Sequence, residues 1–347
     1  MKVTQVPTVR RSRLYEKSSD GRVRCGTCER RCSLQPGQEG FCRTRRNVDG
    51  DLFTLVYGDI SSASANPIEK KPFFHFWPGS YALTVGTWSC NFLCPWCQNW
   101  EISKYAPNPE KANYLGPDKL VRMALEEKCQ GISISFNEPI LLFEYSLDVF
   151  PLARRKGLYN SYVSNGYMTS EALRTLRDAG MDAIKFDMKG TADTYKEYCG
   201  ADVDVVWRNI AEAKQLGMHV EVVALLITGV NDSDDEVRKI SRRHVEAAGP
   251  EAPLHFTRFH PSYKMTDRLS TPVSTLERAH AIAKNEGVLY VYVGNVPGHR
   301  LENTYCHNCG ALIIQRYGFA VAKYAISDDG KCPRCAEPIP IVGRHVG

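Results

Sequence analysis

Three closely spaced cysteines carry the clearest chemical information in the sequence. They follow an apolar stretch at 81–87 and read Cys90-Asn-Phe-Leu-Cys94-Pro-Trp-Cys97. A [4Fe–4S] cluster takes four ligands, and cysteine thiolates are the usual ones. Three cysteines can therefore hold three irons and leave the fourth iron open to chelate the amino and carboxylate groups of a small molecule. A zinc knuckle is the competing interpretation, but these three cysteines lack a fourth partner.

The spacing Cys-x3-Cys-x2-Cys, with Trp96 just before the last cysteine, resembles the motif of the radical S-adenosylmethionine (SAM) superfamily. The resemblance implies that Cys90, Cys94 and Cys97 hold a catalytic [4Fe–4S] cluster, with Trp96 beside the cofactor. It also implies that the cluster cleaves SAM reductively to a 5′-deoxyadenosyl radical, which abstracts hydrogen from a substrate. In such enzymes the cofactors carry the difficult chemistry, while the protein orients them and excludes solvent.

Polar residues at the expected ends of two strands resemble SAM-binding elements of this superfamily. Glu138 resembles the acidic end of a Gly-Gly-Glu element that holds the SAM amino group, although Phe136 and Asn137 replace the glycines. Asn165 resembles the asparagine of the Thr-Asn-Gly element of glycyl-radical activating enzymes. We expect both residues in the cofactor pocket, since the carboxyl ends of parallel strands meet on one face.

Two later strand ends resemble the same activating enzymes. Asp187-Met-Lys189 matches their Asp-x-Lys, in which the lysine pairs with the SAM carboxylate, and His260 matches a histidine near the ribose. Asp187 and Lys189 face the same side of an extended strand. Lys185 shares that side but is expected to lie too far back along the strand to reach the rim.

The middle of the chain alternates between apolar runs and helical patterns. Near-continuous apolar strands between helices indicate parallel βαβ units, and helix start signals precede several helices, at Thr169 and Ser233 for instance. The sequence predicts an α/β fold, a partial (βα)6 TIM-like barrel open on one side with small Cys-rich metal-binding modules at both ends. The expected strands are 81–87, 131–135, 159–164, 183–189, 219–227, 253–259 and 288–293; the expected helices are 117–129, 141–156, 169–179, 205–217, 233–247 and 272–286.

Two outer cysteine sets flank this core. Cys306-x2-Cys309 and Cys332-x2-Cys335 have zinc-ribbon spacing, which predicts a four-thiolate site for zinc, with a rubredoxin-like iron as the alternative. The N-terminal set could bind zinc or an auxiliary iron–sulfur cluster, and zinc is the first choice by a small margin. Its members are Cys25, Cys28, Cys32 and Cys42.

Over nearly its full length the chain resembles the radical SAM enzyme of the AmmeMemoRadiSam group, which is pyruvate formate-lyase activating-enzyme-like. The shared features are the cysteine sets, Asn66–Pro72, Gln98-Asn99 and Gly294–His299. We divide the chain into a basic four-cysteine module (1–50), a connecting segment (51–80), a radical SAM core (81–300) and a zinc-ribbon-like module (301–347). The resemblance also implies a flavodoxin- or ferredoxin-like electron donor.

Composition and charge limit the cellular compartment and the binding partners that can be expected. The thirteen cysteines, without a secretion signal, indicate metal or catalytic thiols in a reducing, cytoplasmic compartment. The longest apolar runs are too short to span a membrane. Residues 1–46 carry twelve Lys/Arg and four Asp/Glu, a basic balance that suits nucleic acid, an acidic protein surface or simply solvent.

Three functions compete. The first is radical modification of a protein or peptide, as in glycyl-radical activation. A macromolecular substrate is therefore expected, and protein is favoured over RNA. The second is radical modification of RNA, which the basic N-terminal segment and the ribbon would serve. The third, from another class, is a non-catalytic iron–sulfur and zinc binding module. The sequence leaves the physiological substrate open.

Overall fold

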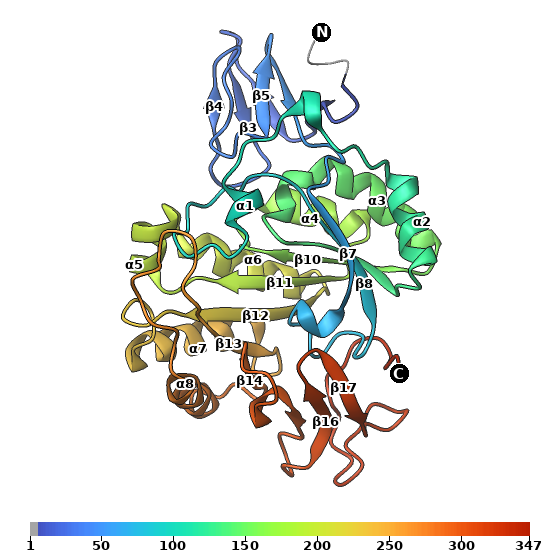
Figure 1. Cartoon of the computed structure of the whole chain (residues 1–347), viewed down its shortest axis with the longest axis vertical. Helices are drawn as coiled ribbons and strands as arrows, with labels where there is room; N and C mark the ends of the chain where they lie inside the picture. The colour runs from blue at the N-terminus through green and yellow to red at the C-terminus, as the bar shows by residue number, and fades with distance from the viewer. Residues whose placement is uncertain (1–5) are drawn as a thin grey trace. The chain divides into compact units, whose positions relative to one another are not determined.

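The computed structural model describes residues 6–347, so the first five residues of the predicted 1–50 module lie outside the described residues. Within the described range, one eight-stranded sheet runs in the order β14-β13-β12-β11-β10-β9-β8-β7 (Figure 1). Strands that follow one another along the chain are therefore neighbours in the sheet, as in a (βα) barrel and unlike a doubly wound sheet. The bounds are β7 Ser62–Pro67, β8 Tyr81–Gly86, β9 Gly131–Ile134, β10 Tyr159–Ser164, β11 Ala183–Met188, β12 His219–Leu226, β13 Leu254–Arg258 and β14 Val291–Gly294.

The predicted α/β class is confirmed, and each predicted strand of the core is present within a few residues of its expected bounds. The pairs β8–β9, β9–β10, β12–β13 and β13–β14 are parallel. Every residue of β9 is buried, as are nearly all of β10 and β13. Strands covered on both faces read as continuous apolar runs, which is why the sequence identified them. The edge strand β7 was not predicted, because it reads Ser-Ala-Ser-Ala-Asn-Pro.

The predicted helices are also confirmed. The side chain of Thr169 accepts a hydrogen bond from Ala172 N and so caps α4, and Ser233 caps α7 through Glu236 N. In the part of the chain that the structure describes, no helix combines the length and apolarity needed to cross a membrane. The main helices are α2 Pro117–Glu126, α3 Phe143–Arg155, α4 Ser170–Ala179, α6 Val203–Gln215, α7 Asp234–Ala248 and α8 Val273–Asn285; the short ones are α1 Trp100–Ser103, η2 Ile68–Lys70, η3 Pro109–Lys111, η4 Pro139–Leu142, α5 Ala192–Thr194, η5 Tyr195–Cys199 and η6 Arg300–Glu302.

Contacts divide the chain into two compact units. Unit 1 consists of Met1–Ala65 and Ala82–Ile184, and unit 2 of Asn66–Tyr81 and Lys185–Gly347. In unit 1, α2, α3 and α4 pack side by side, and in unit 2, α6, α7 and α8 do the same. The motif cysteines and the N-terminal cysteine set lie in unit 1, whereas the ribbon cysteines lie in unit 2.

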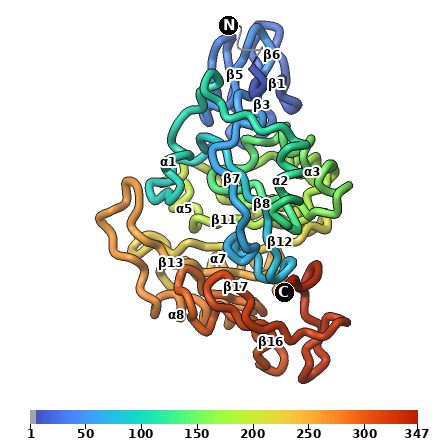
Figure 2. Tube along the Cα trace, turned by 45° about the vertical axis from the view of Figure 1, so that its right-hand side comes forward, coloured from blue at the N-terminus to red at the C-terminus, as the bar shows by residue number. Residues whose placement is uncertain are grey.

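The N-terminal part of unit 1, blue in Figure 2, is built of short antiparallel strands. They form two three-stranded sheets, β1-β6-β5 and β2-β3-β4, around a small core of Val23, Cys25, Leu34 and Leu52. Arg45, in this part of the chain, makes a buried bidentate ion pair with Glu144 of α3. Its two guanidinium nitrogens lie 2.8 and 2.9 Å from the two carboxylate oxygens. The bounds are β1 Arg10–Arg11, β2 Tyr15–Lys17, β3 Val23–Cys25, β4 Ser33–Leu34, β5 Arg45–Val48 and β6 Asp51–Thr54.

In unit 2, the C-terminal module is a three-stranded antiparallel sheet of β15 Thr304–Tyr305, β16 Leu312–Tyr317 and β17 Ala320–Tyr324. It is fastened to the segment 66–81 of the same unit. Arg316 donates to the Phe74 carbonyl at 2.7 Å, and Val342 N donates to the His75 carbonyl at 2.8 Å. Glu221 on β12 accepts hydrogen bonds from both Phe74 N and His75 N. A small cysteine-rich module is thereby anchored by hydrogen bonds to the larger core of unit 2.

Candidate functional site: a cysteine loop and two outer thiol sets

The loop that carries Cys90, Cys94 and Cys97 is held by the turn that follows β9. Gly86, the last residue of β8, lies against this turn, because a Cβ at this position would be 2.9 Å from the carbonyl oxygen of Ser135. The side chain of Asn137 accepts from Thr87 N at 3.1 Å and donates to the Ser89 carbonyl at 2.7 Å. Asn137 thus ties both sides of the loop's first turn.

Phe136 takes the backbone conformation that glycine favours. Its φ is +70°, where the Gly-Gly-Glu element of the superfamily would carry a glycine. A non-glycine residue in this left-handed region costs roughly 1–3 kcal/mol. The strain has a structural use, since the Phe136 carbonyl accepts a hydrogen bond from Asn99, which ends the cysteine loop. Phe136 therefore takes a backbone conformation that glycine would adopt without strain.

Hydrogen-bond donors surround the sulfurs of the loop. Phe92 N donates to Cys90 Sγ at 3.4 Å, the Asn165 amide lies 3.9 Å from the same sulfur, and Cys97 Sγ lies 3.0 Å from Ser103 Oγ. Trp96 beside them is buried. Burial raises the pKa of the Cys90 thiol, with further contributions from Glu138 and Cys94, whereas metal binding would deprotonate it.

Glu138 links the ends of β9 and β10. Its carboxylate is fully buried and accepts hydrogen bonds from Ile140 N at 3.1 Å, Ser164 Oγ at 2.8 Å and Asn165 N at 2.9 Å. Asn165 in turn donates to Asn91 Oδ1 at 2.7 Å. The structure therefore brings the predicted residues Cys90, Glu138 and Asn165 into one network within unit 1, in which Glu138 fixes the backbone at Asn165.

The remaining predicted SAM residues lie in unit 2. Asp187, near the end of β11, is 3.5 Å from Lys189 Nζ through Oδ2, and its other oxygen pairs with Lys185 Nζ. Although burial opposes it, the charges of Lys185 and Lys189 lower the pKa of the Asp187 carboxyl. Lys185, expected to lie too far back to reach the rim, is buried, and its long side chain extends along the strand to Asp187. Burial lowers the pKa of Lys185.

Two further strand-end residues lie in unit 2. Asn231 donates to the Lys189 carbonyl at 2.9 Å and accepts from Ile227 N at 2.7 Å, so it joins the loop after β12 to the end of β11. His260, which follows β13, is exposed, and its Nδ1 lies 3.1 Å from Ser270 Oγ. The ring of His260 is therefore accessible at the carboxyl end of its strand.

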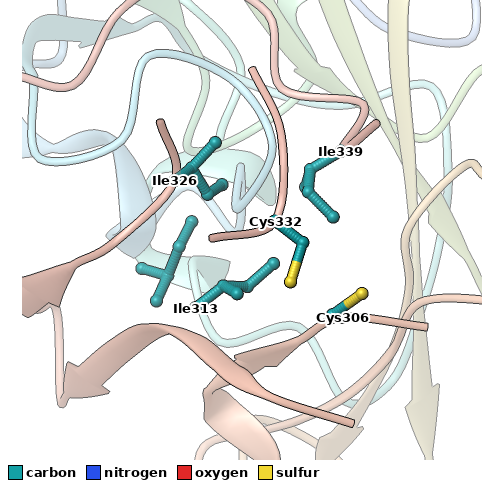
Figure 3. Packing of buried hydrophobic residues seen from close by; sticks show 6 residues of the cluster. Cys306, Ile313, Ile326, Cys332 and Ile339 are labelled. Atoms are coloured by element: carbon teal, nitrogen blue, oxygen red, sulfur yellow. The ribbon is translucent and has the colours of Figure 1, made fainter. Parts of the chain in front are cut away.

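The C-terminal cysteines converge tightly. Cys306 Sγ lies 3.6 Å from Cys335 Sγ, and Cys309 Sγ lies 3.6 Å from Cys332 Sγ. A tetrahedral metal with Zn–S bonds of about 2.3 Å separates its sulfurs by about 3.8 Å, so the donor set fits one metal ion. Although burial opposes it, backbone N–H groups lower the pKa of Cys332 to about 7. Figure 3 shows that Cys306 and Cys332 lie beside a core that contains Ile313, Ile326 and Ile339.

The other two cysteine sets are arranged more widely. Among residues 6–347, the C-terminal four, whose ligand atoms all lie within 4.8 Å of one another, are the one group of His, Cys, Asp or Glu side chains placed closely enough to hold a metal ion. Cys25, Cys28 and Cys42 are nevertheless all buried, and burial raises the pKa of Cys28, as do Cys25 and Cys42. The N-terminal thiols are thus neighbours without being in tetrahedral contact.

Sequence reasoning missed the amides that hold the site together. Asn91, Asn137 and Asn231 stand next to motif residues or at strand ends, and each makes side-chain hydrogen bonds that fix a loop. Their one available signal was position, since asparagine beside a motif cysteine or after a strand commonly bonds backbone groups. Glu221 was also missed. It is fully buried and hydrogen-bonds His219 and His255, which together lower the pKa of its carboxyl although burial opposes this.

Comparisons with known proteins agree on the core. A family model described as the radical SAM superfamily matches residues 85–242. The uncharacterized protein MJ0808 of Methanocaldococcus jannaschii is 42% identical over 335 residues, which cover 96% of this chain and 100% of the relative. A GTP 3′,8-cyclase of Aliarcobacter butzleri is 24% identical over 159 residues; the match covers 44% of this chain and about half, 49%, of the cyclase.

Solved structures also match the chain. A domain of the pyruvate-formate lyase-activating enzyme from Bacteroides vulgatus has a TM-score of 0.42 at 13% identity, covering 48% of this chain and 99% of that one. SuiB of Streptococcus suis bound to S-adenosylmethionine has a TM-score of 0.48 at 12% identity, covering 69% of this chain and 56% of that one.

Proposed function

The chain belongs to the radical SAM superfamily and is therefore an enzyme; on that premise we propose that Cys90, Cys94 and Cys97 hold the [4Fe–4S] cluster with which it uses SAM. When bound, this cluster supplies the electron that cleaves SAM and so generates a radical able to abstract hydrogen from a substrate. The observation that carries the proposal is the loop itself, with three cysteines and no fourth, fixed at both ends by hydrogen bonds from the turn after β9.

The residues around the loop suit a cluster. Its three cysteines are not among the side chains that lie closely enough, within residues 6–347, to hold a single metal ion, whose sulfurs would be about 3.8 Å apart. Phe92 N and the Asn165 amide point donors at Cys90, which favours a thiolate there. Cys94 is buried, whereas Cys90 and Cys97 are partly exposed.

SAM brings a carboxylate, an ammonium and a sulfonium into its pocket, and each requires a counterpart. We assign the carboxylate to Lys189, which Asp187 and the Asn231 contact hold at the end of β11. Asp187 serves the sulfonium or the ribose, with His260 also near the ribose. The buried negative charge of Glu138 favours the ammonium, and Asn165 and Trp96 complete the cofactor residues.

The substrate we propose is a protein or peptide, and the reductant is a flavodoxin- or ferredoxin-like one-electron donor. The support is the set of strand-end residues that resemble those of glycyl-radical activating enzymes. RNA remains the alternative substrate, but no contact among the described residues favours it. Seven of the ten arginines between Arg10 and Arg46 form ion pairs with carboxylates, which leaves less of the basic charge for phosphates.

For the C-terminal set we propose structural zinc. Four sulfurs already at tetrahedral spacing favour it, and a sheet of three short strands has too small a core to be stable alone. All thirteen cysteines are free thiols, which supports a reducing compartment such as the cytoplasm.

An anaerobic assay tests the proposed function. The reconstituted protein is incubated with SAM and a one-electron reductant, with and without protein, peptide or RNA fractions of cell extract. We expect 5′-deoxyadenosine, with mass spectrometry finding the new product in the protein or peptide fraction. A product in the RNA fraction would move the assignment to the second function. Absence of 5′-deoxyadenosine in a protein with a full cluster would leave the non-catalytic binding module.

A further inference from the structure

The N-terminal cysteines enclose a void, which we call the cysteine chamber. Its lining combines the thiols with apolar side chains and with two arginines, Arg30 and Arg45. It has room for roughly one water molecule. Its thiol lining consists of all four residues of the set, Cys25, Cys28, Cys32 and Cys42, and its apolar lining of Leu34, Ile140 and Leu141.

The size of the chamber separates the two candidates for its occupant. In a tetrahedral zinc site the centre lies only about 2.3 Å from each sulfur, which is closer than the contact distance of about 3.2 Å between sulfur and a water-sized sphere. Four thiols at zinc spacing therefore leave no void. A [4Fe–4S] cluster places its four cysteine sulfurs about 6 Å apart, with the centre about 4 Å from each. A void of the size of a water molecule among the thiols means that they stand farther apart than a zinc site would hold them, which favours the cluster.

The same chain supplies an internal reference for both spacings. The ribbon set, Cys306 to Cys335, has sulfurs 3.6 Å apart in pairs and all within 4.8 Å of one another. Neither the N-terminal set nor the catalytic loop set is gathered this closely among the described residues. In this respect the N-terminal thiols resemble the cysteines for which the superfamily indicates a cluster, and differ from the zinc-like set.

Hydrogen-bond donors also lie against the thiols of the chamber. Phe41 N donates to Cys32 Sγ at 3.5 Å, and Cys42 Sγ lies 3.1 Å from Thr44 Oγ1. Asn91 is fully buried, and its Nδ2 has no hydrogen-bond partner of normal geometry within residues 6–347. Its amide lies next to Cys28, so a Cys28 thiolate that ligates a cluster would be its acceptor.

Asn91 also connects the chamber to the catalytic loop. It follows Cys90 directly, its Oδ1 accepts from Asn165, and its carbonyl accepts from Arg30 Nε at 3.0 Å. Arg30 itself lines the chamber. The two cysteine sets therefore lie next to each other within unit 1, with one residue of the loop between them.

We infer that Cys25, Cys28, Cys32 and Cys42 bind an auxiliary [4Fe–4S] cluster, not zinc, beside the catalytic loop. From spacing alone zinc has a small preference, because the spacing matches no standard motif, and the chamber reverses that preference.

The test uses the full chain with Cys90, Cys94 and Cys97 replaced by Ala, which removes the catalytic ligands. After anaerobic reconstitution with iron and sulfide, we expect this triple variant to retain about four irons and four acid-labile sulfides per chain, with the Mössbauer spectrum of a [4Fe–4S] cluster. The sulfide count matters because iron in a four-thiolate site such as the ribbon carries no sulfide.

Adding Cys32→Ser or Cys28→Ser to the triple variant should remove this iron and sulfide, whereas adding Cys129→Ser, at a buried cysteine outside the three sets, should not. Cys32 is partly exposed, so its variant tests the site even if Cys28→Ser fails to fold. The inference is overturned if the triple variant contains zinc in addition to the ribbon's and no sulfide, or if it holds only two irons.

Discussion

Asp187 is shared by two lysines, and their positions give them different tasks. Lys185 is almost completely buried and pairs with one oxygen of Asp187, whereas Lys189 is partly exposed and lies 3.5 Å from the other. An unpaired buried charge is costly, so Lys185 fixes and neutralises Asp187 in the free protein. We propose Lys189, the less buried of the two, as the partner of the carboxylate that the cofactor brings.

Replacement of Lys189 by Met should weaken SAM binding by roughly 1.5–3 kcal/mol, the range for a hydrogen bond to a charged group. The cluster should stay intact, because Lys189 lies outside the cysteine loop. SAM affinity and iron content are measured together, with Arg238→Met as a control, since Arg238 belongs to an exposed pair on α7. Wild-type affinity in Lys189→Met with a full cluster would show that another group holds the carboxylate.

Residue types and their spacing predicted the chemistry of the site better than they predicted the contacts between its side chains. The cysteine spacings, Glu138 and the Asp-x-Lys pair are visible in the sequence because they have fixed neighbours along the chain. The partnership of Lys185 with Asp187 depends on side-chain length and rotamer. The hydrogen bond of Asn91 to Asn165 joins residues 74 positions apart, and no local pattern predicts it.

At the scale of elements, the apolar strands and the capped helices could be predicted, because burial on both faces and N-cap chemistry leave local signals. The strands of the N-terminal part could not. All six of its strands, β1 to β6, have only two to four residues, and four of them contain exposed positions, so they are too short for a period-2 pattern. Their stability comes instead from the small core and from the ion pair with α3.

That ion pair gives a sharp prediction. Arg45 and Glu144 are 2% and 5% exposed in their side chains, so Arg45→Met would leave a buried carboxylate without its cation and should cost about 3–5 kcal/mol. Arg46→Met is the matched control, because Arg46 pairs with Glu39 at a side-chain exposure of 34% and 31% and should cost less than about 1 kcal/mol. Urea unfolding of both variants provides the comparison. Equal losses of unfolding free energy in the two variants would show that the buried pair stabilises the protein no more than the exposed pair.

The C-terminal sheet should depend on its metal. Its core is formed by Cys306 and Cys332 together with Ile313, Ile314, Ile326 and Ile339, so loss of the metal removes the link that holds these residues together. Cys309→Ser should lose about one zinc per chain and become sensitive to protease after residue 300. Cys199→Ser, at a cysteine outside the three sets, should keep its zinc. Zinc loss without new cleavage would mean that the sheet is stable by itself.

At the scale of the whole molecule, buried neutral histidines should make the protein sensitive to acid. Burial lowers the pKa of His75 to about 3 and that of His244 to about 4, and it lowers the pKa of His255 as well. In the unfolded chain these groups titrate near 6.5. Below that pH the unfolded state binds more protons, so stability falls as the pH falls, by up to about 1.4 kcal/mol per pH unit for each histidine.

His244→Gln isolates one of these contributions. His244 lies in α7, and its Nε2 bonds the Ala252 carbonyl at 2.8 Å, a contact that a glutamine amide can replace. The free energy of unfolding between pH 7.5 and 5.5 should fall less steeply in the variant, by the equivalent of one proton. Loss of metal in acid affects both proteins alike and cancels in the difference. Identical slopes would contradict a neutral His244 in the folded state.

The most direct test of the central claim is the yield of 5′-deoxyadenosine from SAM in Cys94→Ala compared with Cys129→Ala. Cys94 belongs to the loop and Cys129 to none of the three sets, and both are buried. Each protein is reconstituted anaerobically and given SAM and a one-electron reductant. We expect wild-type yield in Cys129→Ala and no 5′-deoxyadenosine in Cys94→Ala, together with loss of the iron bound at the loop. Retained SAM cleavage in Cys94→Ala would contradict the account.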